Sequence, residues 1–422
     1  MGAKYIKKSI FQTSLLVLVI LLSALAFSGC IAGGAVASGS SGVIIDNDVL
    51  FVGSMEGKLV AANTTDGRLL WEVALESQAS TGGLLGCAPA SKAVAIYSSP
   101  AVAEDLVYVG GYDGKIRAIS SSTRLSADEY LIKDDKSSPQ PIIGGPVVAQ
   151  DKVYIGSSDG CVYALNGISL NPVWAMPFET GGKIWSTPAI SENTLYIGSF
   201  DKKVYALNTA DGNKKWEFET EGAIVSTPLV DDNTVYVGSF DRHLYAIDAT
   251  SGSLKWKFQA ENWFWAKSAV YNDTIYAACL DGKVYALDAE SGNKQVEFDL
   301  GSPIASSPVL VDDLLIVATE EGIIYTIDTG TNQQKQLVNL EEKVYAPLAT
   351  SQGKVYIHTL TDALYKIDAQ SGAKQSISLT GATPPSSEQP SGTTNWWLII
   401  GILVGGIFLI IVFQALRRRR SA

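Results

Sequence analysis

A carboxylate or a side-chain amide recurs at one position of successive sequence repeats, and side chains of this kind can act as general acids, general bases or metal ligands. The set comprises Asn208, Asp248, Asp288, Asp328 and Asp368. Such side chains also accept hydrogen bonds from backbone two residues further on, and glycines that complete the turn follow at Gly212, Gly252, Gly292 and Gly372. We therefore predict turn residues here, not a catalytic or metal site. The same prediction holds for a second recurring set, Asp159, Asp201, Asp241 and Asp281.

Histidine and cysteine give no stronger indication of chemistry. The two histidines of the sequence, His243 and His358, have no neighbouring Cys or His at metal-ligand spacing. The sequence also lacks a recognisable phosphate-binding glycine loop, calcium loop or Ser/His/Asp arrangement. We expect no catalytic residue, no metal and no cofactor.

The elements that position these side chains belong to a unit of strand, turn and strand that occurs eight times. One aromatic or aliphatic residue in the first strand of the hairpin marks each copy: Phe51, Tyr108, Tyr154, Tyr196, Tyr236, Tyr276, Ile316 and Tyr356. The last five markers lie 40 residues apart. A fixed period of this length indicates a repeat architecture.

Each repeat supplies about four short strands. Residues 235–238 and 244–247 alternate with the period of a strand, and Asp241-Arg242 provides the turn between them. A short strand after a Ser/Thr-Pro pair and a closing strand that carries a tryptophan complete the unit. Because four antiparallel strands cannot bury both of their faces alone, the repeats must stack. We predict an all-β fold, an eight-bladed β-propeller of four-stranded antiparallel blades over residues 41–379, with an open solenoid as the alternative.

Aromatic side chains gather in the segments that should emerge on one face of this propeller, the hairpin turns and the links between repeats. They are Tyr112, Trp185, Phe200, Phe240, Trp263, Phe264 and Trp265. Exposed aromatic clusters mark interaction sites. We predict that these residues form a partner-binding surface. The alternative is that Trp185 and Trp265 fill the axial channel of the ring.

The N-terminus has the layout of a secretory signal. Residues 1–37 combine Lys4, Lys7 and Lys8 with an apolar stretch, so the repeats are expected outside the cytoplasm. Two cleavage sites compete, a lipoprotein box that would lipidate Cys30 and a small-residue site at residues 35–37. An uncleaved N-terminal membrane helix is a third reading.

The C-terminus predicts a membrane anchor. Residues 396–416 are apolar and long enough to cross a bilayer, with Trp396 and Trp397 at one end and the basic tail, residues 417–422, at the other. Residues 380–395, rich in Pro, Ser and Thr, predict a stalk. We expect a single-pass protein of the cytoplasmic membrane, with its propeller outside and its C-terminus inside.

The chain is acidic. Its formal net charge is −11, and outside the seven cationic residues of the two tails it has 25 Lys and Arg against 43 Asp and Glu. This excess argues against a nucleic acid or an anionic lipid as ligand of the propeller. We expect envelope or secreted proteins as partners, with surface polymers as a further class.

The repeat resembles that of the pyrroloquinoline-quinone-like (PQQ-like) β-propeller family. The resemblance rests on the Tyr-Ala-Ile-Asp at 245–248, on Gly252 and on Trp256 four residues later, which recur together at set distances over residues 43–379. It implies that Trp71, Trp174, Trp216 and Trp256 dock each blade on the next.

Members of this family include quinone-dependent dehydrogenases and the cofactor-free lipoprotein subunit of the outer-membrane β-barrel assembly machinery. The dehydrogenases share a pair of adjacent cysteines, and this sequence has none. The resemblance therefore favours a non-enzymatic scaffold or sensor that binds proteins. A quinone-dependent dehydrogenase and a carbohydrate-binding module are the alternatives, and the C-terminal helix departs from the purely lipid-anchored subunit.

Overall fold

The computed structural model describes residues 41–77, 92–134 and 136–379. The signal peptide, Cys30, the stalk, the transmembrane helix and the basic tail that we predicted all lie outside these residues. Among the described residues, no helix has the length and apolar character needed to span a membrane. The domain boundaries at the two ends therefore stay predictions.

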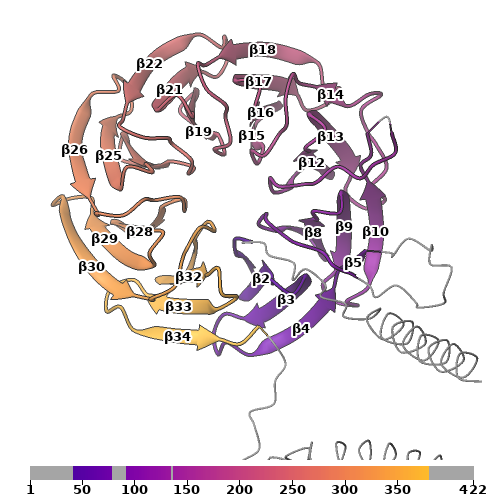
Figure 1. Ribbon diagram of the computed structural model, residues 1–422, viewed down its shortest axis with the longest axis horizontal. Helices are drawn as coiled ribbons and strands as arrows, with labels where there is room; N and C mark the ends of the chain where they lie inside the picture. Colours follow the sequence, from indigo (N-terminus) through magenta and orange to yellow (C-terminus); the bar gives the residue numbers. More distant parts are fainter. Residues whose placement is uncertain (1–40, 78–91, 135, 380–422) are drawn as a thin grey trace, which may run out of the picture. The chain divides into compact units, whose positions relative to one another are not determined.

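The described residues form eight four-stranded antiparallel sheets, each built from four consecutive strands. The sheets stand side by side in a ring, with the last strand of each at the outer rim (Figure 1). The predicted eight-bladed β-propeller is thus confirmed, and the open solenoid is wrong. We number the blades from the N-terminus.

The first four blades contain the following strands. Blade one comprises β1 (Ile44–Asp46), β2 (Val49–Gly53), β3 (Lys58–Asn63) and β4 (Leu69–Ala74). Blade two comprises β7 (Ala101–Ala103), β8 (Leu106–Gly110), β9 (Lys115–Ser120) and β10 (Ser126–Leu131). Blade three comprises β11 (Val147–Ala149), β12 (Lys152–Gly156), β13 (Cys161–Asn166) and β14 (Phe178–Glu179). Blade four comprises β15 (Ala189–Ser191), β16 (Thr194–Gly198), β17 (Lys203–Asn208) and β18 (Lys214–Glu219).

The other four blades repeat this plan. Blade five comprises β19 (Leu229–Asp231), β20 (Thr234–Gly238), β21 (His243–Asp248) and β22 (Leu254–Gln259). Blade six comprises β23 (Ala269–Tyr271), β24 (Thr274–Ala278), β25 (Lys283–Asp288) and β26 (Lys294–Asp299). Blade seven comprises β27 (Val309–Val311), β28 (Leu314–Ala318), β29 (Ile323–Asp328) and β30 (Gln333–Asn339). Blade eight comprises β31 (Ala349–Ser351), β32 (Lys354–His358), β33 (Leu364–Asp368) and β34 (Lys374–Ile377). The short strands β5 (Glu76–Ser77) and β6 (Lys92–Ala93) pair outside the blades.

The burial of the strands explains their sequences. The second strand of blade five, β20, is buried along its whole length because both of its faces pack against neighbouring blades. Its sequence is accordingly β-branched and aromatic, Thr-Val-Tyr-Val-Gly. The outermost strand β22 instead alternates exposed and buried residues, and its buried Trp256 contacts the next blade.

Blades one and eight close the ring by side-chain contacts, because each blade keeps its own four strands. Tyr356 donates its hydroxyl hydrogen bond to Thr64 O at 3.1 Å across the junction. The imidazole of His358 is fully buried there, with Nδ1 2.9 Å from Ser41 O and Nε2 2.9 Å from Asp362 Oδ1. Asp362 Oδ1 also accepts a hydrogen bond from the N–H of Met55 at 2.8 Å. This cluster joins the two ends of the described chain.

We expect His358→Ala to lower the free energy of unfolding by about 2–4 kcal/mol, because it opens a cavity and removes the imidazole that contacts the buried Ser41 carbonyl and the Asp362 carboxylate. Urea denaturation followed by near-ultraviolet circular dichroism measures the change. His243→Ala is the matched control: this imidazole contacts Asp241 of its own turn, and its loss should cost under about 1 kcal/mol. Equal losses in the two variants would contradict the assigned role of His358.

Candidate functional site

Five aromatic side chains from two links and two hairpin turns form a continuous cluster. The rings of Trp185 and Phe200 meet edge to face at 4.7 Å between centroids, and Phe200 meets Phe240 in the same way at 6.3 Å. Phe240 stacks on Trp263 at 4.5 Å and on Trp265 at 5.6 Å. These distances lie in the range of favourable aromatic pairs. We call Trp185, Phe200, Phe240, Trp263 and Trp265 the aromatic surface.

The aromatic surface remains open to solvent. Trp263 is 42% exposed and Trp265 is 37% exposed, although both are stacked on Phe240. An indole held at this exposure by its neighbours keeps a large apolar area in water. Among the described residues these two are the only tryptophans with a large exposed side chain.

Two residues that we predicted for this surface lie elsewhere. Phe264 is 1% exposed and belongs to the core between blades five and six, beneath Gly238. The alternation of side chains along the extended link directs it inward, whereas Trp263 and Trp265 on either side face outward. Tyr112 is exposed, but it pairs with Tyr97 at 5.6 Å and forms a separate contact. Five of the seven predicted residues therefore come together.

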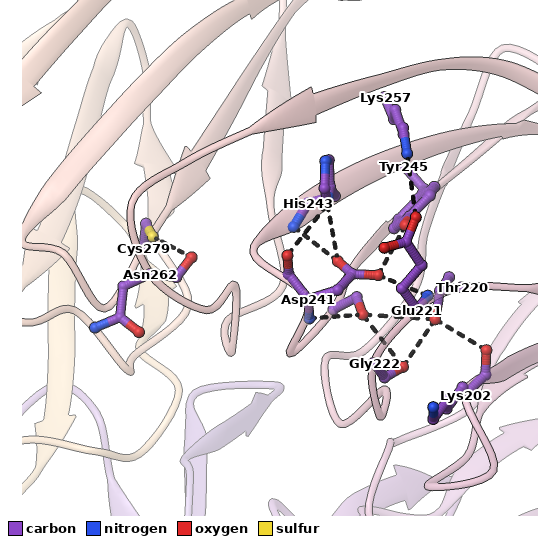
Figure 2. A network of polar contacts seen from close by, with 11 residues as sticks. Lys202, Thr220, Glu221, Gly222, Asp241, His243, Tyr245, Lys257, Asn262 and Cys279 are labelled. Carbon is purple, nitrogen blue, oxygen red and sulfur yellow. Dashed lines mark hydrogen bonds and ion pairs between the residues drawn. The ribbon is translucent and has the colours of Figure 1, made fainter.

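A polar network fixes the turn that carries Phe240 (Figure 2). The carboxylate of Asp241 accepts hydrogen bonds from the His243 N–H at 2.9 Å, the Tyr245 hydroxyl at 2.7 Å and the Glu221 N–H at 2.8 Å. The last bond ties the turn to the link that precedes it. Beside it, Thr220 Oγ1 donates to the carbonyls of Lys202 and Gly222.

The titration behaviour of this network matches a structural role. Burial opposes ionisation of Asp241, yet the donors from Tyr245 and from the backbone of His243 and Glu221 outweigh it and hold the pKa of this carboxyl below its usual value. Burial and the Asp241 carboxylate raise the pKa of Tyr245. Both oxygens of the carboxylate are occupied by donors, so the group positions the turn. The same Tyr-to-Asp bond recurs in neighbouring blades, at Tyr205 and Asp201 and at Tyr285 and Asp281.

The turns of blades four and five have a non-glycine residue at a position where the backbone has positive φ. In five blades a glycine with positive φ occupies the third position of this turn: Gly57, Gly114, Gly160, Gly282 and Gly322. Lys202 and Arg242 take its place at φ 75° and 74°. Both cations are exposed and form no ion pair within the described ranges, and each lies two residues after a phenylalanine of the aromatic surface. Side chains at such φ values carry strain, which is often found at functional sites.

The third non-glycine residue at this position has a visible structural reason. Asp362 of blade eight has a φ of 65°, and its carboxylate bonds His358 and Met55 N in the ring closure. The side chains of Lys202 and Arg242 have no such partner among residues 41–77, 92–134 and 136–379. Their cations therefore face the solvent beside the aromatic surface.

An axial cavity of about 220 Å³ begins where the aromatic surface ends. Trp185 and Trp265 line its mouth together with Tyr97, Val225 and Tyr345. The polar residues of its lining are serines, threonines, tyrosines, tryptophans and one lysine, and it has no carboxylate or side-chain amide. The calcium-bound quinone of the dehydrogenases needs oxygen ligands from such groups, so this lining does not fit it.

The four tryptophans that we assigned to blade docking are buried at the junctions between blades. The indole Nε1 of Trp174, Trp216 and Trp256 donates to the carbonyls of Thr209, Ala249 and Ala289 in the following blade, at 3.1, 2.9 and 2.9 Å. Trp174 does so although it precedes the two-residue strand β14. Trp71 packs in the core between blades one and two.

The recurring carboxylates that the sequence assigns to turns accept backbone hydrogen bonds, as predicted. Asp248 Oδ1 accepts them from Thr250 N at 3.1 Å and from Ser251 N at 2.8 Å. No group of three or more His, Cys, Asp or Glu residues suited to a metal occurs in the part of the chain that the structure describes. The aromatic surface and the axial cavity are the candidate functional features.

Comparisons with known proteins agree with the observed fold. The family described as outer membrane protein assembly factor BamB matches residues 28–175 and 169–378. The crystal structure of BamB from Moraxella catarrhalis is similar with a TM-score of 0.64 and 18% identity, covering 77% of this chain and 95% of that one. The computationally designed Ika8 protein is similar with a TM-score of 0.64 and 14% identity, covering 78% and 96%. At these identities the two structures show the fold alone. No curated protein matches the chain.

We expect Lys202→Gly and Arg242→Gly each to raise the free energy of unfolding by about 1 kcal/mol, because glycine adopts positive φ without the steric cost of a side chain. Denaturant titration measures the shift. Lys202→Ala and Arg242→Ala are the controls, since they remove the charge and keep the strain. If alanine stabilises the protein as much as glycine does, the effect is one of charge and the strain argument fails.

Proposed function

Because the chain belongs to the family of outer membrane protein assembly factor BamB, we propose that it is a non-enzymatic scaffold or sensor that binds a protein partner through its aromatic surface. The observation that carries the proposal is the stack of Trp263 and Trp265 on Phe240, which holds two indoles in water at 42% and 37% exposure. Tryptophan dominates the binding energy of protein interfaces when it lies at their centre.

The rigidity of the aromatic surface supports this proposal. Its members come from links and turns that the Asp241 network and the blade cores hold in place, so little conformational entropy is lost when a partner docks. The exposed Lys202 and Arg242 add positive charge beside it. A partner segment that combines apolar or aromatic residues with acidic ones matches this composition.

We also propose that the propeller is tethered outside the cytoplasm. The supporting features are the signal-like residues 1–37 with the lipoprotein box at Cys30, the apolar residues 396–416 and the basic tail, residues 417–422. In this arrangement residues 380–395 act as a stalk above the cytoplasmic membrane. Partners would then be envelope or secreted proteins, or surface polymers.

A helix that ends in a cytoplasmic tail differs from attachment by lipid alone. The name of the family refers to assembly of outer membrane proteins, and an anchor in the cytoplasmic membrane is a different location. We therefore propose that the protein binds an envelope protein, and we assign it no step in the assembly of outer membrane proteins.

We expect Phe240→Ala and Trp265→Ala to weaken binding of the partner by about ten-fold or more, since each removes an aromatic contact at the centre of the surface. The measurement is quantitative affinity co-purification of full-length protein from its own membranes, followed by a dissociation constant for each depleted partner.

Leu254→Ala is the control for this experiment, because Leu254 is 44% exposed at the start of the outer strand β22 and does not belong to the links and turns that form the aromatic surface. Its set of co-purified proteins should equal that of the unmodified protein. An unchanged set with both aromatic variants, in folded protein, would refute the proposal.

The alternative function, a quinone-dependent dehydrogenase, predicts that the protein binds its cofactor. Calorimetry distinguishes this function from the proposed one. We expect no calcium-dependent binding of pyrroloquinoline quinone to the full-length protein, because the described lining of the axial cavity offers no carboxylate or amide ligand for calcium. Calcium-dependent binding at micromolar concentration would instead establish the dehydrogenase reading.

A further inference from the structure

One position of the repeat lines the axial channel in successive blades. It is the residue directly before the proline of the Ser/Thr-Pro pair, or its counterpart where that pair is absent. Four blades place a hydroxyl there, from Ser99, Thr187, Thr227 and Ser307, and three place glycine or proline. Blade six places Lys267. Neighbouring members of this ring contact each other, since the N–H of Lys267 donates to Ser307 Oγ at 3.1 Å.

Lys267 lies where two cavities meet. The upper cavity, of about 220 Å³, opens toward the aromatic surface. The lower cavity, of about 460 Å³, shares Lys267 and the four hydroxyl residues with it. The side chain is exposed to the water of the channel, and the protein around it still desolvates it enough to lower its pKa below the usual value for lysine.

No carboxylate balances this ammonium group. Neither cavity has an Asp or Glu in its lining, and Lys267 has no ion-pair partner within the described ranges. Lys267 is the only charged residue in the linings of these two cavities, although the chain has 43 acidic residues. An anion that enters the channel would find this ammonium group free to form a charge-assisted hydrogen bond.

Two further donors, on residues that line the upper cavity, have no hydrogen-bond partner in the part of the chain that the structure describes. Ser98 is 4% exposed, and its buried Oγ has no hydrogen bond. The buried Nε1 of Trp185 has none either, in contrast to Nε1 of Trp174, Trp216 and Trp256. Both residues line the same cavity. Buried donors are normally satisfied, so these two point to a group that accepts hydrogen bonds.

The mouth of the cavity is apolar. Trp185, Trp265, Tyr97 and Tyr345 surround it with aromatic rings, and Val225 adds an aliphatic surface. A ligand that reaches Lys267 from above must pass between these rings. Its outer part therefore gains by being apolar or aromatic, as in other small-molecule sites.

We propose that the axial channel is a receptor site for a carboxylate carried on an apolar or aromatic body, with the carboxylate at Lys267 and the surrounding hydroxyls and the body between Trp185 and Trp265. One ammonium group matches one negative charge, so a monocarboxylate fits better than a doubly charged phosphate. The hydroxyls donate to the remaining lone pairs. This site shares Trp185 and Trp265 with the aromatic surface, but its charged contact, Lys267, is not part of that surface.

The experiment uses full-length protein in a non-ionic detergent at constant chloride concentration and neutral pH. Isothermal titration compares 3-phenylpropionate with its neutral amide, 3-phenylpropanamide, which has the same shape. A charge-assisted contact should make the acid bind roughly ten- to a hundred-fold more tightly than the amide. Lys267→Met should abolish this preference, and Lys267→Arg should retain it.

Lys335→Met is the matched control, because Lys335 is exposed on the outer strand β30 of blade seven. Its preference for the acid should equal that of the unmodified protein. Equal binding of acid and amide, or an unchanged preference in Lys267→Met, would overturn the proposal. No binding of any acid at millimolar concentration would overturn it as well.

A second pair of probes identifies the source of the carboxylate. N-acetyl-glycyl-phenylalanine carries the same group at a peptide C-terminus, and its C-terminal amide is the control. If the site prefers the peptide acid over 3-phenylpropionate, it receives the end of a polypeptide chain. If it takes only the small acid, it receives a free carboxylic acid. Both outcomes require Lys267, which separates them from adventitious binding.

Discussion

The contact of each blade with the next is the interaction on which the rest of this structure depends. At the junction of blades four and five, Ala249 O accepts hydrogen bonds from the Tyr196 hydroxyl at 3.2 Å and from Trp216 Nε1 at 2.9 Å, both from the preceding blade. The indole of Trp216 also packs on Gly252. Only glycine fits, because a Cβ at this position would lie 2.7 Å from the ring. A four-stranded sheet thereby buries both faces, which it cannot do alone.

A closed ring of such contacts explains why the loops can form a defined surface. The turns and links are short and are tied to one another, as the bond from Glu221 N to Asp241 shows. The rings of Phe200 and Phe240 therefore lie at a fixed spacing, set by the blades that carry them. The ring also creates an axial channel. One position of the repeat contributes a residue to the lining of this channel in successive blades. At that position blade six has Lys267, which adds a positive charge to the lining of both cavities.

The fold could be predicted from the sequence because each repeat carries the same pattern of strands and turns. Eight copies of one pattern predict strands, turns and blade number even where single copies depart from it, as blade three does at β14. The recurring carboxylates could be assigned to turns for the same reason. Side-chain direction in the irregular link was not predictable: Phe264 turns into the core, although both of its neighbours are exposed. Lys267 could not be recognised either, because its isolation depends on which residues of seven other repeats face the axis.

The most direct test of the account is site-specific photocrosslinking in native membranes. Benzoylphenylalanine replaces Phe240 in the aromatic surface or, as a control, Leu254 on the outer strand β22. If the partner docks on the aromatic surface, one protein is crosslinked from position 240 and not from position 254. Crosslinking from position 254 with none from position 240 would show that the partner uses the rim of the propeller, and would contradict the account.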